Sequence, residues 1–369
     1  MALSPGRREG PPTAPHIAWA VAATTIVYAV VAVVSLSFGS SEVGGATFVW
    51  EALTGRLGEA ERTILWRARF PRVAMAGIVG AALATSGAVF QAVLRNPLAD
   101  PYILGISGGA ALGGTAVLAA GAAVGAGWMG AAGLAGIAGA LTPAVAAFVG
   151  ALGSVAVIFG VGRLAPGGRG GTYVLLLTGV VVNAFASAVI LFFKSVVSAR
   201  KAQEILFYLM GTLAVGGTDG SVVATIGGLV ALCLAGLLWF ARDLNVLSLG
   251  EREAASLGVD ARFVRRATVG IASLAVAASV AFTGLIGFVG LVVPHGIRLL
   301  TGPDHRLLLP CCAVGGAAFL TASDLAARAS FDVFSTALPV GVVTAFVGAP
   351  LFMVFLWRNL SRATAEGGG

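Results

Sequence analysis

Charged side chains are scarce in this chain. Of its 369 residues, 11% are Asp, Glu, Lys or Arg, whereas a soluble domain usually contains about 25%. Lysine occurs only at Lys194 and Lys201, and neither follows a glycine. The chain therefore contains no G-x-x-x-x-G-K-[ST] phosphate loop, and if it works with ATP, another subunit must hydrolyse the nucleotide.

Reactive side chains are equally few, with three histidines and three cysteines. Their spacing excludes the H-E-x-x-H zinc motif, and no G-x-S-x-G elbow is present. Cys311 and Cys312 are adjacent, which fits neither a metal spacing nor a disulfide framework. His295 and His305 are too few ligands for a metal site. We predict no catalytic residue, no metal and no cofactor in this chain.

Apolar residues dominate instead. Hydrophobic side chains make up 58% of the chain, the mean hydropathy is +0.96, and apolar runs of about twenty residues recur throughout, as membrane-spanning helices require. The 53 glycines show no G-X-Y period, which excludes collagen, and they suit close helix packing in lipid. The sequence predicts an all-α, polytopic membrane protein with about ten transmembrane helices.

The apolar runs divide the chain into an N-terminal tail (1–15), a transmembrane domain (16–358) and a C-terminal tail (359–369). The apolar stretch Ala267–Leu300 would be about 51 Å long as one helix, but a hydrocarbon core is only about 30 Å thick. We therefore expect a break at Thr283-Gly284. The expected spans are His16–Phe38, Pro71–Leu94, Pro101–Val124, Gly130–Phe159, Tyr173–Phe193, Val222–Phe240, Ala267–Phe282, Leu285–Leu300, Leu307–Ala327 and Ala337–Trp357.

The net charge of +7 does not indicate nucleic-acid binding, because the basic residues stand singly in short loops. An even number of spans places both termini on one side of the membrane. The larger share of arginines falls in the segments on that side, so the positive-inside rule makes both termini cytoplasmic. The outer segments still hold more arginine than the rule alone explains.

A proline-rich motif follows the second span. Pro71 suits the start of that span because its missing N–H would have no partner in a first turn. Asn96-Pro97 and Asp100-Pro101 should end one helix and begin the next, since the residue before a proline disfavours helical geometry. We expect a tight hairpin on the inner side; a generic inter-helix turn is the alternative.

The long inner segment 242–266 contains an amphipathic stretch. Leu247–Gly258 is expected to form a short helix that stops at Gly258, with Leu249 and Leu257 flanking a charged turn. Such a segment could fit a groove on a cytoplasmic partner. An interfacial helix lying on lipid is the alternative.

A few polar residues occur within the spans. Asp324 and Arg328 are one helical turn apart, and their pairing would lower the cost of charge at the membrane edge. Gln91 and Asn183 are expected to bond neighbouring helices. Lining of a transport pathway is the alternative for these two.

Taken in order, several motifs resemble one known family. They are Arg-Phe-Pro-Arg (69–72), Arg-Asn-Pro-Leu-Ala-Asp-Pro (95–101), Leu-Leu-Leu-Thr-Gly-Val-Val-Val-Asn (175–183), Leu-Ser-Leu-Gly-Glu (247–251), Gly-Phe-Val-Gly-Leu-Val-Val-Pro-His (287–295), Gly-Pro-Asp-His-Arg (302–306), Leu-Pro-Val-Gly-Val-Val-Thr-Ala (338–345) and Gly-Ala-Pro (348–350). From Phe70 to Trp357 the chain resembles permease subunits of bacterial iron-siderophore, haem and cobalamin ABC importers, the FecCD type (type II importers, vitamin B12 permease-like).

The resemblance implies a bacterial cytoplasmic (inner) membrane protein that carries a metal chelate. Its implied partners are a second permease subunit (an identical copy or a paralogue), two ABC ATPase subunits that bind ATP and Mg, and a periplasmic or lipid-anchored substrate-binding protein. Membrane lipid surrounds it, and no nucleic acid is involved.

The resemblance also implies roles for individual residues. ATPase coupling falls on Leu247, Ser248, Leu249, Gly250, Glu251, Ala254, Leu257 and Gly258. Docking of the binding protein falls on Arg69, Arg72 and Arg328, which would account for part of the outer arginine excess. A structural motif comprises Arg95, Asn96, Pro97, Asp100, Pro101, Pro294 and His295. The fifth and tenth spans are expected to line the pathway.

Two rival functions stay open. An ATP-independent channel or proton-coupled carrier would need an ionisable residue within a span, and Asp324 is the main candidate. A membrane-embedded enzyme would need a catalytic constellation, which the sequence lacks. The motifs do not separate ferric siderophore, haem and cobalamin, although the segment 197–211 is closer to cobalamin-type relatives.

Overall fold

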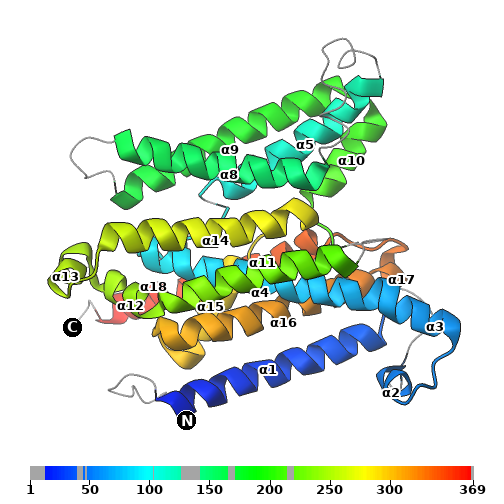
Figure 1. Ribbon diagram of the computed structural model, residues 1–369, viewed down its shortest axis with the longest axis horizontal. Helices are drawn as coiled ribbons and strands as arrows, with labels where there is room; N and C mark the ends of the chain where they lie inside the picture. Colours follow the sequence, from blue (N-terminus) through cyan, green and yellow to red (C-terminus); the bar gives the residue numbers. More distant parts are fainter. Residues whose placement is uncertain are drawn as a thin grey trace.

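The protein is an all-helical bundle in a computed structural model, and the part of the chain that the structure describes contains no strand. The described residues are 13–39, 45, 48–102, 104–125, 142–164, 171–213 and 220–366. The long helices lie side by side along the longest axis of the molecule (Figure 1).

The helices of the described residues follow one another along the chain. Their bounds are α1 Ala14–Ser37, α2 Phe48–Leu53, α3 Glu59–Ile64, the π-helical turn η1 Leu65–Arg69, α4 Phe70–Leu94, α5 Ile106–Gly125, α8 Pro143–Leu164, α9 Gly171–Val196, α10 Ala199–Leu209, α11 Gly220–Trp239, α12 Ala241–Leu249, α13 Glu251–Ser256, α14 Ala261–Thr283, α15 Val289–Thr301, α16 His305–Ala329, α17 Phe331–Phe334 and α18 Val340–Glu366.

The membrane-spanning helices agree with the expected fold class. Among the described residues, seven helices are long and apolar enough to cross a membrane, and α5, α15 and α18 contribute three shorter apolar stretches. These correspond one to one with the ten expected spans. The prediction of an all-α polytopic membrane protein is therefore confirmed.

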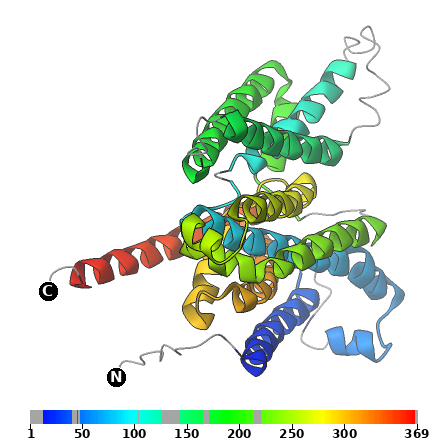
Figure 2. The ribbon, with the colours of Figure 1, turned by 60° about the vertical axis from the view of Figure 1, so that its left-hand side comes forward.

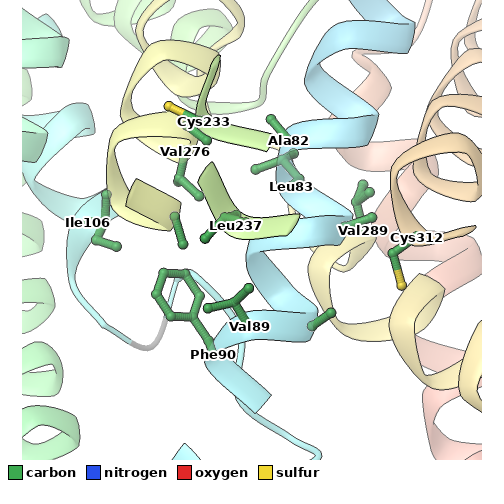
Figure 3. Close-up of a cluster of buried hydrophobic side chains, with 14 of the residues drawn as sticks. Ala82, Leu83, Val89, Phe90, Ile106, Cys233, Leu237, Val276, Val289 and Cys312 are labelled. Atoms are coloured by element: carbon green, nitrogen blue, oxygen red, sulfur yellow. The ribbon is translucent and has the colours of Figure 1, made fainter. Parts of the chain in front are cut away.

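Helix α4 forms the centre of the bundle. In its most apolar window 83% of the residues are buried, compared with 67% for α14 and α16 and none for α1. Figure 3 shows Val89 and Phe90 of α4 meeting Leu237 of α11 and Val276 of α14 in a core of apolar side chains. Dispersion and small-residue contacts hold this core together, since lipid offers no hydrophobic driving force between helices.

Glycines let the central helices touch along their backbones. A methyl group at Gly80 of α4 would collide with the carbonyl oxygen of Gly316 of α16, and one at Gly87 would collide with that of Gly290 of α15. Only glycine permits such an approach. The helices α4 and α16 are thus packed as one rigid pair.

The expected break after the seventh span is present. Helix α14 ends at Thr283, and Gly284 has φ 69°, a left-handed conformation that suits glycine. The chain then runs to Phe288 before α15 begins at Val289. The length of the apolar stretch was therefore a sound argument against one continuous span.

Several details of the expected helices were wrong. The third span begins at Ile106, because the chain turns at residues 97–98, 101–102 and 104–105, where two residues that precede prolines disfavour helical geometry. The eighth begins at Val289 instead of Leu285. The stretch Leu247–Gly258 is two helices, α12 and α13, because Gly250 interrupts it with φ 151°. The first part of the fourth span, residues 130–141, lies outside the described residues.

The two ends of the bundle carry different parts of the chain. Both termini, α12 and α13 lie at one end, here called the terminus end (Figures 1 and 2). Helices α2, α3 and α17 lie at the other, the far end. Exposed tryptophans stand near both ends, Trp19 and Trp239 at the first and Trp66 at the second, as is typical of residues at the two membrane–water interfaces.

Candidate coupling and docking sites

The α12–α13 segment is anchored by its apolar face. Leu244 and Leu247 of α12 are 0% and 1% exposed, and Ala254 of α13 is fully buried. Between the helices, Gly250 adopts a φ that other residues rarely adopt, and a side chain there would strike the carboxylate of Glu253. The segment is a fixed part of the bundle surface rather than a loose loop.

The opposite face of the same segment is exposed. Leu249 at the end of α12 is 67% exposed and Leu257 after α13 is 63% exposed, with the charged side chain of Glu251 between them in sequence. Gly258 follows with φ 78° and ends the segment, as the sequence predicted. These two leucines leave apolar surface on the exposed face of the segment.

The eight residues assigned to ATPase coupling thus fall into two groups. Leu247, Gly250 and Ala254 are buried and hold the segment. The exposed members can touch a partner directly; they are Ser248, Leu249, Glu251, Leu257 and Gly258. Their coupling role stays a prediction.

Polar contacts tie the segment to two transmembrane helices. Glu251 forms an ion pair with Arg265 of α14, and Asn245 bonds Asp304 and His305 at the start of α16. Sequence reasoning assigned no contact to Arg265, Asn245 or Asp304, although Asp304 stands in the 302–306 motif. Asn245 and Asp304 are 59 residues apart, and no local spacing signals such a contact.

The proline-rich hairpin is built from side-chain-capped turns. Arg95 has a left-handed φ of 47° and ends α4. The Asn96 Oδ1 accepts a bond from the backbone N–H of Leu98 at 2.9 Å, and the Asp100 Oδ1 accepts one from Tyr102 at 2.8 Å. Such turns are the usual use of Asn and Asp in loops.

The hairpin has an exposed and a buried half. Pro97 is exposed, whereas Asp100 and Pro101 are buried. Asn183 of α9 donates its Nδ2 hydrogen to the Tyr102 carbonyl at 2.6 Å, so this predicted inter-helix polar residue holds the hairpin. These hydrogen bonds all hold the shape of the hairpin.

Three further residues singled out in the sequence, Gln91, Pro294 and His295, lie within the helix packing. The Gln91 Nε2 donates to the Gly290 carbonyl at 3.3 Å, which links α4 to α15 as expected. Pro294 is buried inside α15, and the ring of His295 packs against Phe355 of α18 with 4.7 Å between ring centroids. Among the described residues, no group of three or more His, Cys, Asp or Glu side chains could hold a metal ion.

The three arginines assigned to docking lie at the far end of the bundle. Asp324 of α16 is fully buried, and its carboxylate receives bonds from Arg72 Nε at 2.9 and 3.1 Å and from Arg328 Nε at 3.1 Å. The predicted pair between Asp324 and Arg328 is therefore confirmed. We call Arg69, Arg72, Asp324 and Arg328 the arginine cluster.

Two members of the arginine cluster hold the end of α1. The Arg69 Nη1 donates to the carbonyls of Leu36 and Ser37 at 2.8 and 3.1 Å. Arg328 donates to the Phe38 carbonyl at 2.8 Å and to Ser35. The last carbonyls of a helix lack partners within it and carry partial negative charge, so guanidinium groups stabilise them.

Exposure differs sharply within the arginine cluster. Arg69 and Arg328 are each 5% exposed, whereas the Arg72 side chain is 23% exposed. A docking carboxylate could reach Arg72 directly, but it would have to displace α1 carbonyls to reach the other two. The docking role of all three stays a prediction.

The segment that suggested a cobalamin-type relative forms the surface helix α10 at the far end. Lys201 donates to Glu204 at 2.6 Å, and this hydrogen bond lowers the pKa of Glu204 below its ordinary value. The buried face of α10 is centred on Ile205. Its charged face is open to solvent.

Comparisons with known proteins agree with this architecture. The model of the FecCD transport family matches residues 26–358. The cobalamin import system permease protein BtuC of Halobacterium salinarum is 40% identical over 305 residues, which cover 83% of this chain and 76% of the relative. The hemin transport system permease protein HmuU of Yersinia pestis is 35% identical, with 90% and 95% covered.

A more distant relative and a solved structure extend the comparison. The molybdate import system permease protein MolB of Haemophilus influenzae is 30% identical, with 90% of this chain and 94% of the relative covered. A structure described as an inward-facing conformation of a metal-chelate type ABC transporter superposes with a TM-score of 0.76 at 28% identity, covering 92% and 98% of the two chains. The chain therefore belongs to the FecCD transport family and is a permease subunit of an ABC transporter, not an enzyme.

Proposed function

We propose that this chain forms half of the membrane pathway of an ATP-driven importer that carries a metal chelate into the cytoplasm. Relatives named for cobalamin and hemin import support this class of cargo. Cobalamin is the first candidate because its importer is the more similar of the two. The molybdate relative indicates that family membership alone does not identify the cargo.

The proposed assembly contains a second permease subunit, two ATPase subunits and a substrate-binding protein. The absence of a phosphate loop from the sequence supports a separate ATPase. In this proposal the terminus end faces the cytoplasm of a bacterial inner membrane, and the far end faces the binding protein.

The exposed leucines of the α12–α13 segment carry the proposal. Leu249 and Leu257 project from a segment whose other face is locked into the bundle. A rigid projection with an apolar tip is suited to a groove on the ATPase. Closure of the ATPase dimer on ATP would move this segment and switch the permease pair between outward- and inward-open states.

Docking of the binding protein is proposed at the arginine cluster. Two guanidinium groups share the Asp324 carboxylate there, and a third, that of Arg69, binds carbonyls of α1, which leaves positive charge for an acidic partner. Arg72 is the accessible member. Because an exposed ion pair is worth only about 0–1 kcal/mol, such a contact sets docking register and on-rate more than affinity.

A secondary carrier is less well supported. Asp324 was its candidate ionisable residue, but both carboxylate oxygens are engaged by arginines and the side chain is fully buried. The geometry is that of a structural tie between α4 and α16. It does not place a carboxylate on an accessible pathway.

Uptake in a deletion strain tests the cargo. Radiolabelled cobalamin, haem and a ferric siderophore are supplied in parallel to cells lacking this gene and to complemented cells. We expect complementation to restore cobalamin uptake alone, and depletion of ATP to abolish it. Restoration of a different cargo would reassign the substrate, and uptake that survives ATP depletion would contradict an ATP-driven importer.

A further inference from the structure

One side-chain amide joins the α12–α13 segment to α16. The Asn245 Nδ2 donates to Asp304 Oδ1 at 2.8 Å. The Asn245 Oδ1 accepts the backbone N–H of His305 at 2.8 Å and lies 2.7 Å from the His305 Nδ1. A single residue of α12 therefore bonds a carboxylate, a backbone amide and an imidazole at the start of α16.

These bonds complete the N-terminus of α16. The first N–H groups of a helix have no partner within it. Asp304, the residue before α16, accepts the Arg306 N–H at 2.9 Å, and Asn245 accepts the N–H of His305 from another helix. The N-terminus of α16 is therefore capped by Asp304, which directly precedes it, and by Asn245 of α12.

The imidazole of His305 has one orientation in this arrangement. An amide oxygen only accepts hydrogen bonds, so the Nδ1 must carry the proton that points to Asn245. His305 is 4% exposed, and its Nε2 has no hydrogen-bond partner among the described residues. The hydrogen bonds of Asn245 fix the direction of the contact between α12 and α16. The apolar packing of Leu244 and Leu247 has no such direction.

We propose that Asn245, Asp304 and His305 form a latch that transmits movement of the α12–α13 segment to α16. The inference rests on the proposed function, because it assigns the source of that movement to the ATPase. Helix α16 runs from the latch to Arg328 of the arginine cluster and is packed on α4 at the Gly80–Gly316 contact. The latch therefore connects the coupling segment to a rigid helix pair whose opposite end holds the docking arginines.

Charge substitutions test the latch in the full-length protein. Asn245→Asp places a second carboxylate against Asp304 and removes the amide donor, so the two side chains repel. We expect amide hydrogen exchange in α12 and in the first turn of α16 to rise about tenfold, as the loss of roughly one charge-assisted hydrogen bond predicts. Cargo transported per ATP hydrolysed should fall by a similar factor.

A compensating variant separates a latch from general damage. Asn245→Asp with Asp304→Asn restores one donor and one acceptor with the roles exchanged, and both measurements should return toward wild type. Asn245→Ala removes the bonds without adding charge and should give a smaller change in the same direction. Asp243→Asn serves as a charge control on α12 and should change neither measurement.

The exchange measurement needs no ATPase, so it judges the latch on its own. Wild-type exchange in Asn245→Asp would overturn the latch, as would a double variant no better than the single one. A wild-type permease that binds no ATPase subunit would overturn the proposed function instead. Faster hydrogen exchange in α12 together with unchanged transport per ATP would also overturn the latch, because the bonds would then hold α12 without transmitting its movement.

Discussion

The far end and the terminus end of the bundle use charge in opposite ways. At the far end, Arg328 is buried against a fully buried Asp324, and Arg69 is buried against the last carbonyls of α1. At the terminus end, the charged residues of α13 are exposed, and Leu249 and Leu257 are the prominent apolar side chains. The first arrangement ties α1, α4 and α16 into one body, whereas the second leaves apolar side chains exposed at the surface.

The energies of the two arrangements differ accordingly. Removing one member of a buried ion pair costs about 3–5 kcal/mol, because the remaining charge is left without a partner. An exposed pair contributes only about 0–1 kcal/mol. Substitutions in the arginine cluster should therefore affect stability, and substitutions of the exposed Leu249 and Leu257 should affect partner binding.

The largest expected effect is that of Asp324→Ala. This change leaves Arg72 and Arg328 without their shared carboxylate, and we expect a loss of about 3–5 kcal/mol in stability. Thermal unfolding of the detergent-purified protein measures it. Asp324→Asn keeps the shape and should lose less, and a wild-type melting temperature for Asp324→Ala would contradict the structural role of the arginine cluster.

A smaller loss is expected when the backbone contact between α4 and α16 is widened. Gly80→Val forces a side chain against the Gly316 carbonyl, and overpacking of this kind typically costs about 1–3 kcal/mol. Gly228→Val on α11 is a matched control, because no atom lies within 4 Å of a methyl group there. Equal melting temperatures for the two variants would show that α4 and α16 are not a rigid pair.

The smallest effect on stability is expected at the terminus end. Leu249→Ala with Leu257→Ala removes exposed side chains and should leave the melting temperature unchanged. Binding of the ATPase subunit should weaken about tenfold or more, as for anchor residues of an interface. Leu300→Ala provides a control, since Leu300 is 83% exposed but lies outside the segment.

Much of the bundle could be predicted from the sequence, because apolar length and proline position are local signals. The break at Thr283-Gly284 followed from length alone, and the hairpin followed from two X-Pro pairs. The interruption at Gly250 was missed because the flanking residues are compatible with a continuous helix. Only the backbone conformation of that glycine reveals it.

The burial of Arg69 and Arg328 could not be predicted in the same way. Arginines at helix ends usually face water, and nothing near them in sequence signals that the carbonyls of α1 will accept their hydrogens. The contact joins residues 290 apart in the case of Arg328 and Phe38. The Asn245 latch could not be predicted from the sequence for the same reason, because its partners lie at the start of another helix.

Transport by purified components tests the central account most directly. The permease, its ATPase and its binding protein are placed in liposomes, and cobalamin uptake is measured with ATP for wild type and for the Leu249→Ala, Leu257→Ala variant. The account predicts ATP-dependent uptake that the variant loses while its fold and melting temperature are retained. Wild-type uptake without ATP, or unchanged uptake in the variant, would contradict it.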